Sequence, residues 1–195
     1  MDAEELLGRY EAGERNFSGV DLEGLNLYKA NLNEANFTDA NLSNTNLSRA
    51  SLRKANLTGA NLSNAKLTGT NLIQANLTGA DLREANLILA ELGLADLGNA
   101  NLSGASLWKA ILNKADFLNA NLSGADLSGA DMVATSLVGA DLTEADMSGA
   151  NMISGDLGGS NLTGTNLKGA NLWNTNLNGT QLDKATLPDG HEYHR

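Results

Sequence analysis

Two histidines near the chain end are the residues of this sequence most suited to acid–base or metal chemistry. His191 and His194 flank Glu192, and these three side chains together could act as metal ligands. A polar chain end accounts for the same residues without any ligand, and we favour that interpretation. The 195 residues include no cysteine, which excludes a Cys nucleophile, a Cys zinc site and a disulfide framework. We therefore expect no metal site and no cofactor.

Paired aspartates are the other candidates for catalysis. Asp126 and Asp146 lie 20 residues apart in a repetitive stretch and should stack one above the other. Acid–base catalysis needs such carboxyl groups in a cleft, whereas the repeats place them on an open, convex wall. The repeats also contain no His or Cys that could form a nucleophile–base pair. We therefore predict that the protein is not an enzyme.

The elements that position these residues are set by a five-residue period. Every fifth residue from Phe17 to Leu187 is Leu, Phe or Met, without a break in phase. On a helix, five residues turn by about 500°, so the leucines would spiral around the axis. In a flat strand, an odd period sends alternate leucines to opposite faces. All of them point inward only if the chain turns a corner in every pentapeptide and winds as a solenoid.

The other positions of the repeat agree with a solenoid. The residue two before each centre is mostly Ala and shares its inward direction, and the remaining three positions are mostly polar. The residue two after each centre is often Gly or Asn, which tolerate the positive φ of a tight turn. Phe17, Phe37 and Phe117 fall in one class modulo 20, which predicts four pentapeptides per coil. About nine coils at ~4.8 Å each then make a rod roughly 42 Å long.

The pattern A(D/N)LXX, present as ANLTG at 55–59 and ADLRE at 80–84, resembles the pentapeptide repeat family. The resemblance covers most of the chain and implies a right-handed, four-sided β-helix. We therefore expect an all-β fold, a right-handed quadrilateral β-helix of about nine coils over residues 15–189. Residues 190–195 are expected to form a C-terminal tail.

Residues 1–14 stand outside the repeat and are expected to form a helical cap. Asp2 and Glu5 fit a capping box, Leu6 and Tyr10 share one helical face, and Gly13 suits a helix stop. An open solenoid end exposes core and unpaired edges, so this helix is expected to cover it.

Composition limits where the protein can be located in the cell and which classes of partner it can bind. No stretch approaches the 18 or more apolar residues of a membrane span, and the N-terminus lacks a basic region followed by an apolar run. We therefore expect a cytoplasmic protein. The sequence shows no basic or amphipathic surface, so we expect neither a nucleic-acid nor a membrane partner.

Negative charge is concentrated in one part of the chain, whose net charge is −10. Residues 116–156 contain seven acids and no Lys or Arg, and we call these acids the acidic belt: Asp116, Asp126, Asp131, Asp141, Glu144, Asp146 and Asp156. Modulo 20, they spread around all four sides of the predicted coil.

The family resemblance raises a second function, because some pentapeptide repeat proteins mimic DNA, bind DNA gyrase and confer quinolone resistance. About 42 Å of B-DNA carries about 25 charges, far more than this rod. The belt approaches DNA density locally, but it does not follow one groove-like track. Those resistance proteins also commonly carry a projecting loop or dimerise through a C-terminal segment, whereas here no insertion interrupts the register and the tail is short. A DNA-mimicking gyrase binder is therefore the alternative.

An apolar stripe is predicted on one side of the coil. Counted in columns of 20, Ile73, Val133, Ile153 and Trp173 align, and Leu94 and Ile111 lie close to them. This stripe indicates a contact surface, although isolated exposed apolar residues are also common. We expect a non-enzymatic structural or protein–protein interaction module with a protein partner, present as a monomer or weak homodimer.

Overall fold

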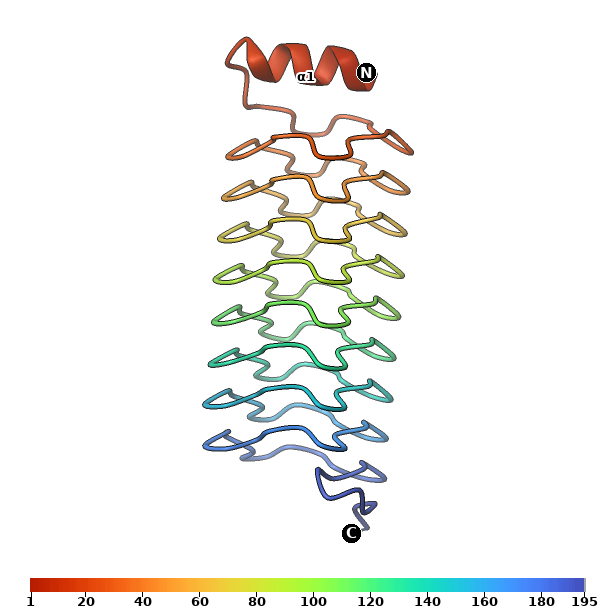
Figure 1. The fold of residues 1–195 in the computed structure, drawn as a ribbon, viewed down its shortest axis with the longest axis vertical. Helices are drawn as coiled ribbons and strands as arrows, with labels where there is room; N and C mark the ends of the chain where they lie inside the picture. The colour runs from red at the N-terminus through yellow and green to blue at the C-terminus, as the bar shows by residue number, and fades with distance from the viewer. Residues whose placement is uncertain (195) are drawn as a thin grey trace.

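The protein is a stack of coils with one helix at its N-terminal end (Figure 1). The computed structural model describes residues 1–194. Helix α1 spans Ala3–Glu11, and the chain then winds continuously towards the opposite end of the stack (Figure 1).

Neighbouring coils are joined by parallel β-bridges between residues 20 apart. The bridges run in steps of five residues, from Asn16–Asn36 to Asn166–Thr186. Each bridge is isolated, so each side of a coil contributes one bridging residue rather than a longer strand. A spacing of 20 residues agrees with the predicted four pentapeptides per coil.

Each corner is a tight turn with a left-handed residue. In a typical corner, the Ala30 N–H donates to the Leu27 carbonyl at 3.0 Å, and Lys29 between them has φ 59°. The same conformation recurs in every repeat from Gly19 to Lys184. Positive φ is unfavourable for most residues with a Cβ, whereas Gly has none and Asn tolerates this conformation, which explains why both are frequent at this position.

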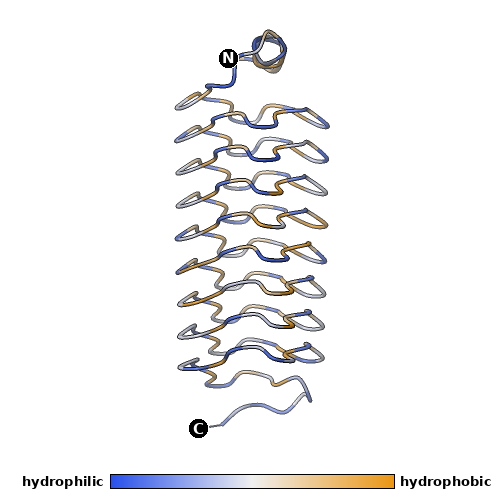
Figure 2. Cartoon of the chain, turned by 90° about the vertical axis from the view of Figure 1, so that its left-hand side faces the viewer, coloured by the Kyte–Doolittle hydropathy of each residue, from blue (hydrophilic) through white to orange (hydrophobic). Residues whose placement is uncertain are grey.

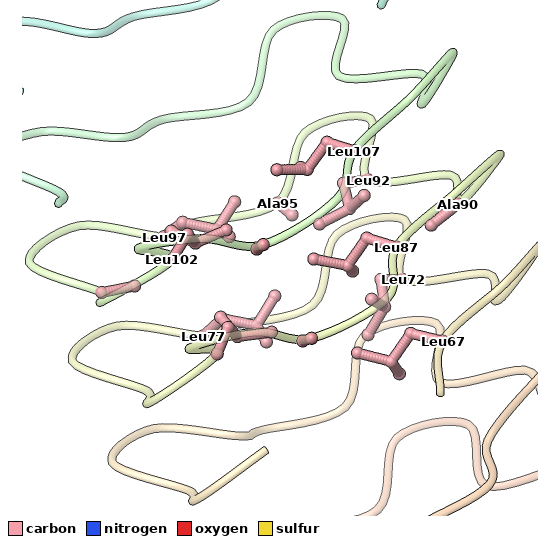
Figure 3. Packing of buried hydrophobic residues seen from close by; sticks show 14 of the residues in the cluster. Leu67, Leu72, Leu77, Leu87, Ala90, Leu92, Ala95, Leu97, Leu102 and Leu107 are labelled. Carbon is pink, nitrogen blue, oxygen red and sulfur yellow. The ribbon is translucent and has the colours of Figure 1, made fainter. Parts of the chain in front are cut away.

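The core is a column of stacked leucines with alanines between them (Figure 3). Hydrophobic and hydrophilic residues alternate along every coil (Figure 2), and the hydrophobic centres are buried. The rings of Phe17 and Phe37 stack at 5.6 Å, as the period of 20 predicted. Where threonine replaces an inner alanine, its hydroxyl is satisfied: Thr135 donates to the Leu112 carbonyl at 2.7 Å.

Helix α1 closes the N-terminal end of this core. The Asp2 side chain accepts the Glu5 N–H at 2.8 Å and caps the helix. Leu6 is fully buried in the core cluster, and the Tyr10 hydroxyl donates to the Asn33 carbonyl at 3.0 Å. The apolar face predicted from the sequence therefore covers the first coil.

Over its described part, the segment expected to be a C-terminal tail pairs with the last repeats through the backbone. The Leu187 N–H donates to the His191 carbonyl and the Tyr193 N–H to the Ala185 carbonyl, each at 2.7 Å. Backbone pairing of this kind has no periodic signal in the sequence. Arg195, the last residue of the predicted tail, lies outside the described residues. In the last coil, Leu177 remains 39% exposed.

Candidate interaction surface

One wall of the solenoid, with the corners on both sides of it, carries most of the exposed apolar residues of the repeats. We name it the Ile111 side, after a residue in its row of bridges. The row consists of Asn31, Ser51, Asn71, Glu91, Ile111, Asp131, Asn151 and Asn171. The whole side comprises residues 28–34, 48–54, 68–74, 88–94, 108–114, 128–134, 148–154 and 168–174.

Stacking of the coils brings the predicted stripe together along one corner. The carbonyls of Val133, Ile153 and Trp173 accept N–H groups from the coil before, at 2.9–3.0 Å. Trp173 is 71% exposed and Leu94 54%, whereas Ile73, Val133 and Ile153 are half-buried. All six predicted residues therefore lie on the Ile111 side. Whether they bind a partner stays a prediction.

A second apolar column lies along the other corner of the same wall. The Leu89 N–H donates to the Trp108 carbonyl at 3.0 Å, which stacks these two corners, and Ile88 precedes Leu89 in the chain. Ile111, 44% exposed, lies in the row of bridges between the two corners. Apolar side chains therefore extend across the wall at this level of the solenoid.

The Ile111 side is also basic, which corrects the expectation that no basic surface exists. It carries seven bases: Lys29, Arg49, Arg53, Lys54, Lys109, Lys114 and Lys168. Against three acids, Glu34, Glu91 and Asp131, this gives a net charge of +4, whereas the whole chain carries −10. Summing charge along the chain hides this side, because its bases come from separate coils. Columns of 20 residues would have revealed it.

Among residues 1–194, the bases of this side have no carboxylate partners. All seven are exposed, and within residues 1–194 none forms a salt bridge or donates a side-chain hydrogen bond. Two of them lie beside aromatic rings instead. The Lys109 ammonium lies 4.4 Å from the Trp108 ring centroid, and that of Lys29 lies 5.2 Å from the Tyr28 centroid.

Most of the acidic belt builds corners. In five of its members one carboxylate oxygen accepts the N–H of the residue two positions later, at 2.8–3.0 Å: Asp116, Asp126, Asp141, Asp146 and Asp156. Asn plays the same role in other repeats, for example Asn101 with the Ser103 N–H. Glu144 is an exposed corner residue with φ 57°.

Asp131 is the exception in the belt. Its two oxygens accept side-chain amide protons from Asn113 and Asn151, at 2.8 and 3.1 Å. The corner N–H of Val133 is bonded instead to the Asn113 amide oxygen, at 2.8 Å. The six aspartates of the belt occupy bridge rows on four different walls, so the belt forms no single acidic track.

The residues considered for catalysis make local contacts within the repeats and the C-terminal segment. Asp126 and Asp146 are bridged one coil apart, and both bond the corner that follows them. His191 lies 3.2 Å from Asp189, and the His191 backbone N–H lowers the pKa of that carboxyl. His194 lies 3.8 Å from Glu192. Residues 1–194 contain no cluster of three or more metal-ligating side chains.

The N-terminal end of the Ile111 side continues into a cavity of about 350 Å³. It is lined by Leu7, Tyr10 and Glu11 of α1 and by residues 28–31 of the first coil. A second cavity, of about 390 Å³, lies at the last coil against residues 179–183 and Tyr193. In the described part of the chain, no helix has the length and apolarity needed to cross a bilayer.

Comparison with known proteins agrees with the repeat pattern. The family model of pentapeptide repeats matches in 8 copies, over residues 16–53, 55–93, 90–129, 125–164 and 160–189. The solved structure of HetL, a pentapeptide repeat protein involved in heterocyst differentiation regulation in the cyanobacterium Nostoc, is similar over 99% of this chain and 100% of its own. Its sequence identity is 31% and its TM-score 0.52.

A second solved structure is similar at lower identity. QnrB1, a plasmid-mediated fluoroquinolone resistance protein, is 21% identical over 86% of this chain and 93% of its own, with a TM-score of 0.54. At this identity the similarity concerns the fold alone. No curated protein sequence matches the chain.

Proposed function

The chain belongs to the pentapeptide repeat family, and from this premise we propose that it is a non-enzymatic protein-interaction module. Its scaffold is a right-handed quadrilateral β-helix of about nine coils. The Ile111 side is the surface that meets a protein partner. The protein acts as a monomer or weak homodimer that presents this side.

The distribution of exposed apolar residues carries the proposal. Within the repeats, the exposed large hydrophobic residues are Tyr28, Leu89, Leu94, Trp108, Ile111, Leu118, Trp173 and Leu177. All except Leu118 and Leu177 lie on the Ile111 side. Isolated exposed apolar residues would be spread over four walls, whereas a concentration on one wall is typical of a contact surface.

Similarity to HetL supports a regulatory role. HetL is involved in heterocyst differentiation regulation and resembles this chain along its whole length. A solenoid whose wall residues build corners and stack coils offers a rigid surface rather than a reaction site. We therefore propose regulation through binding, without assigning the pathway.

A DNA-mimicking gyrase binder is the second candidate, and the base-free acidic belt is the observation in its favour. The belt is spread over four walls, and the Ile111 side is net positive, so the surface offers no continuous acidic track comparable to a DNA backbone. Supercoiling assays with excess pure protein test this candidate. Absence of inhibition disproves it.

The main proposal is tested by affinity capture from the source cell with three baits. These are the wild type, the triple variant V133S/I153S/W173S, and the control S63A/S103A/S123A on a polar column of another corner. Circular dichroism first establishes that all three are folded. We expect a protein that the wild type and the control retain and the apolar variant loses. Identical capture by all three baits contradicts the proposal.

A further inference from the structure

We propose that the Ile111 side binds an acidic protein segment that also carries apolar side chains, laid along the axis of the solenoid. This inference rests on the proposed function, because it names the chemistry of the partner for the same surface. Its basis is the coincidence, on one wall, of exposed apolar residues and of bases that have no acidic partner within the described residues 1–194.

The basic half of the surface lies towards α1. Arg49 lies at one corner of its coil and Arg53 and Lys54 at the next corner, with Ser51 in the bridge row between them. Carboxylates laid over Ser51 would therefore have bases on both sides. The nearest acid of this side is Glu34, and none of the three bases forms a salt bridge among the described residues. Arginine is well suited to bidentate carboxylate binding.

The apolar half follows in the next coils and continues to Trp173. Leu89 and Leu94 lie at the two corners of the wall, with φ of 56° and 61°. Gly or Asn would be less strained in this left-handed conformation. Exposed leucines at these positions therefore cost stability and bury little. Two exposed leucines at such corners are therefore better explained by a contact surface than by the stability of the corner.

The two halves have a defined separation. Arg49 and the apolar Trp108 lie at the same corner three coils apart, which is about 14 Å at the spacing between coils. That distance is spanned by about four residues of extended chain or about ten residues of helix. The partner segment should place its acids and its apolar residues at that separation.

Other occupants fit less well. A second copy would bring one net-positive side against another or would desolvate bases against apolar residues. A nucleic acid would use the bases, but its backbone offers nothing to Ile73, Val133 and Ile153. Nucleic acids and anionic membranes would also meet the remainder of the chain, which carries −14 once the +4 side is subtracted from −10. A short acidic segment can stay within the wall.

The test measures binding of a fluorescein-labelled synthetic peptide by anisotropy at low and physiological salt. The peptide carries a block of glutamates, a flexible spacer of about four residues and a Leu-Trp-Leu end. Matched peptides replace every Glu by Gln or every apolar residue by Ser. A single-stranded oligothymidine and vesicles of phosphatidylcholine with phosphatidylserine serve as competitors.

Two variants divide the surface, and one controls for charge. R49E/R53E/K54E reverses the basic half, L89N/W108S removes part of the apolar half, and K66E/K184E changes bases elsewhere. We expect each surface variant and each altered peptide to weaken binding by about tenfold or more. The K66E/K184E control should stay within about twofold, and added salt should weaken binding of the glutamate peptide.

Three results overturn the inference: no binding of the glutamate peptide, equal binding by all variants, or displacement by the oligonucleotide or the vesicles. The capture experiment separates these failures from failure of the proposed function. If V133S/I153S/W173S still loses a partner while the peptide does not bind, the interaction function stands and the acidic chemistry is wrong. If the peptide binds but all three baits capture the same proteins, the Ile111 side can bind an acidic segment and the proposed interaction function is wrong.

Discussion

The Met152 side chain fills the space in the core where a side chain on Gly155 would lie. A Cβ added to Gly155 would lie 2.6 Å from Cε of Met152 and 3.0 Å from its carbonyl oxygen. The preceding repeat combines a buried Met147 with a buried Ala150, so the fold accepts a methionine centre followed by an inner alanine. The register of bridges continues past this site, from Asp156 to Asn176, so the glycine does not interrupt the solenoid.

We predict that Gly155→Ala destabilises the protein by about 1 kcal/mol, because a methyl group is forced against Met152. Met152→Leu should relieve the clash, so the double variant should be more stable than the sum of the two single effects. Urea denaturation of the four members of this cycle measures the coupling. Met147→Leu is the control and should show no coupling with Gly155→Ala. Additive effects of Gly155→Ala and Met152→Leu contradict the shared space.

Periodicity predicts such a solenoid well and its exceptions poorly. The stack of Phe17 on Phe37 and the Asp or Asn corners follow from residue type and a period of 20. The period marks Gly155 only as a departure from alanine. The reason for that departure is the orientation of Met152, which depends on packing in three dimensions.

We predict that Leu94→Asn stabilises the folded protein by about 1 kcal/mol, because Asn tolerates the left-handed backbone better than Leu. Leu94 is exposed, so little buried apolar area is lost. Thermal and urea unfolding measure the change. Asn99→Leu, at the next corner with φ 57°, is the matched reverse and should destabilise by a similar amount. If Leu94 belongs to the interaction surface, the stabilised variant should bind the glutamate peptide less tightly.

A loss of stability on Leu94→Asn would mean that the leucine makes contacts worth more than the backbone strain. An equal response of Leu94→Asn and Asn99→Leu, in sign and size, would show that the corner conformation does not decide stability at either position.

Acid should weaken the protein partly through Asp81. Hydrogen bonds from the Arg83 guanidinium lower the Asp81 pKa below the ordinary 3.8. Because the folded pKa is the lower one, the added stability is present above about pH 4 and is lost as pH falls through the folded value. Because the Asp81 and Arg83 side chains are 29% and 56% exposed, screening by solvent keeps this contribution small.

Arg83→Ala should therefore destabilise slightly at pH 7 and have no such effect well below the Asp81 pKa. NMR titration of the Asp81 carboxyl should show its pKa rising in the variant. Arg49→Ala, which removes an arginine without a salt-bridge partner among residues 1–194, is the control. An unchanged Asp81 titration in Arg83→Ala contradicts the assigned cause.

The candidate surface could be predicted in part. Ile73, Val133, Ile153 and Trp173 align because equal positions stack every 20 residues, which the sequence shows directly. The basic character of the same wall was missed, because Arg49 and Lys114 are far apart in the chain and the overall charge is acidic. The exposure of each side chain also depends on its corner geometry, which separates half-buried Ile73 from exposed Leu94.

Finally, Asp→Asn substitutions in the acidic belt should differ in their effect on stability, according to the hydrogen bonds that each aspartate accepts. At Asp126 the corner needs only one acceptor oxygen, which Asn also provides, so Asp126→Asn should change stability by less than about 0.5 kcal/mol. Asp131 accepts amide protons on both oxygens, so in Asp131→Asn an NH₂ group would face one of the donors from Asn113 or Asn151. That variant should lose about 1–3 kcal/mol in urea denaturation. Equal effects of the two substitutions would contradict this division. The variant D126N/D146N, with Asp131 unchanged, should therefore remove charge from the belt without disturbing the fold. This is the variant to use in a gyrase or partner-binding assay.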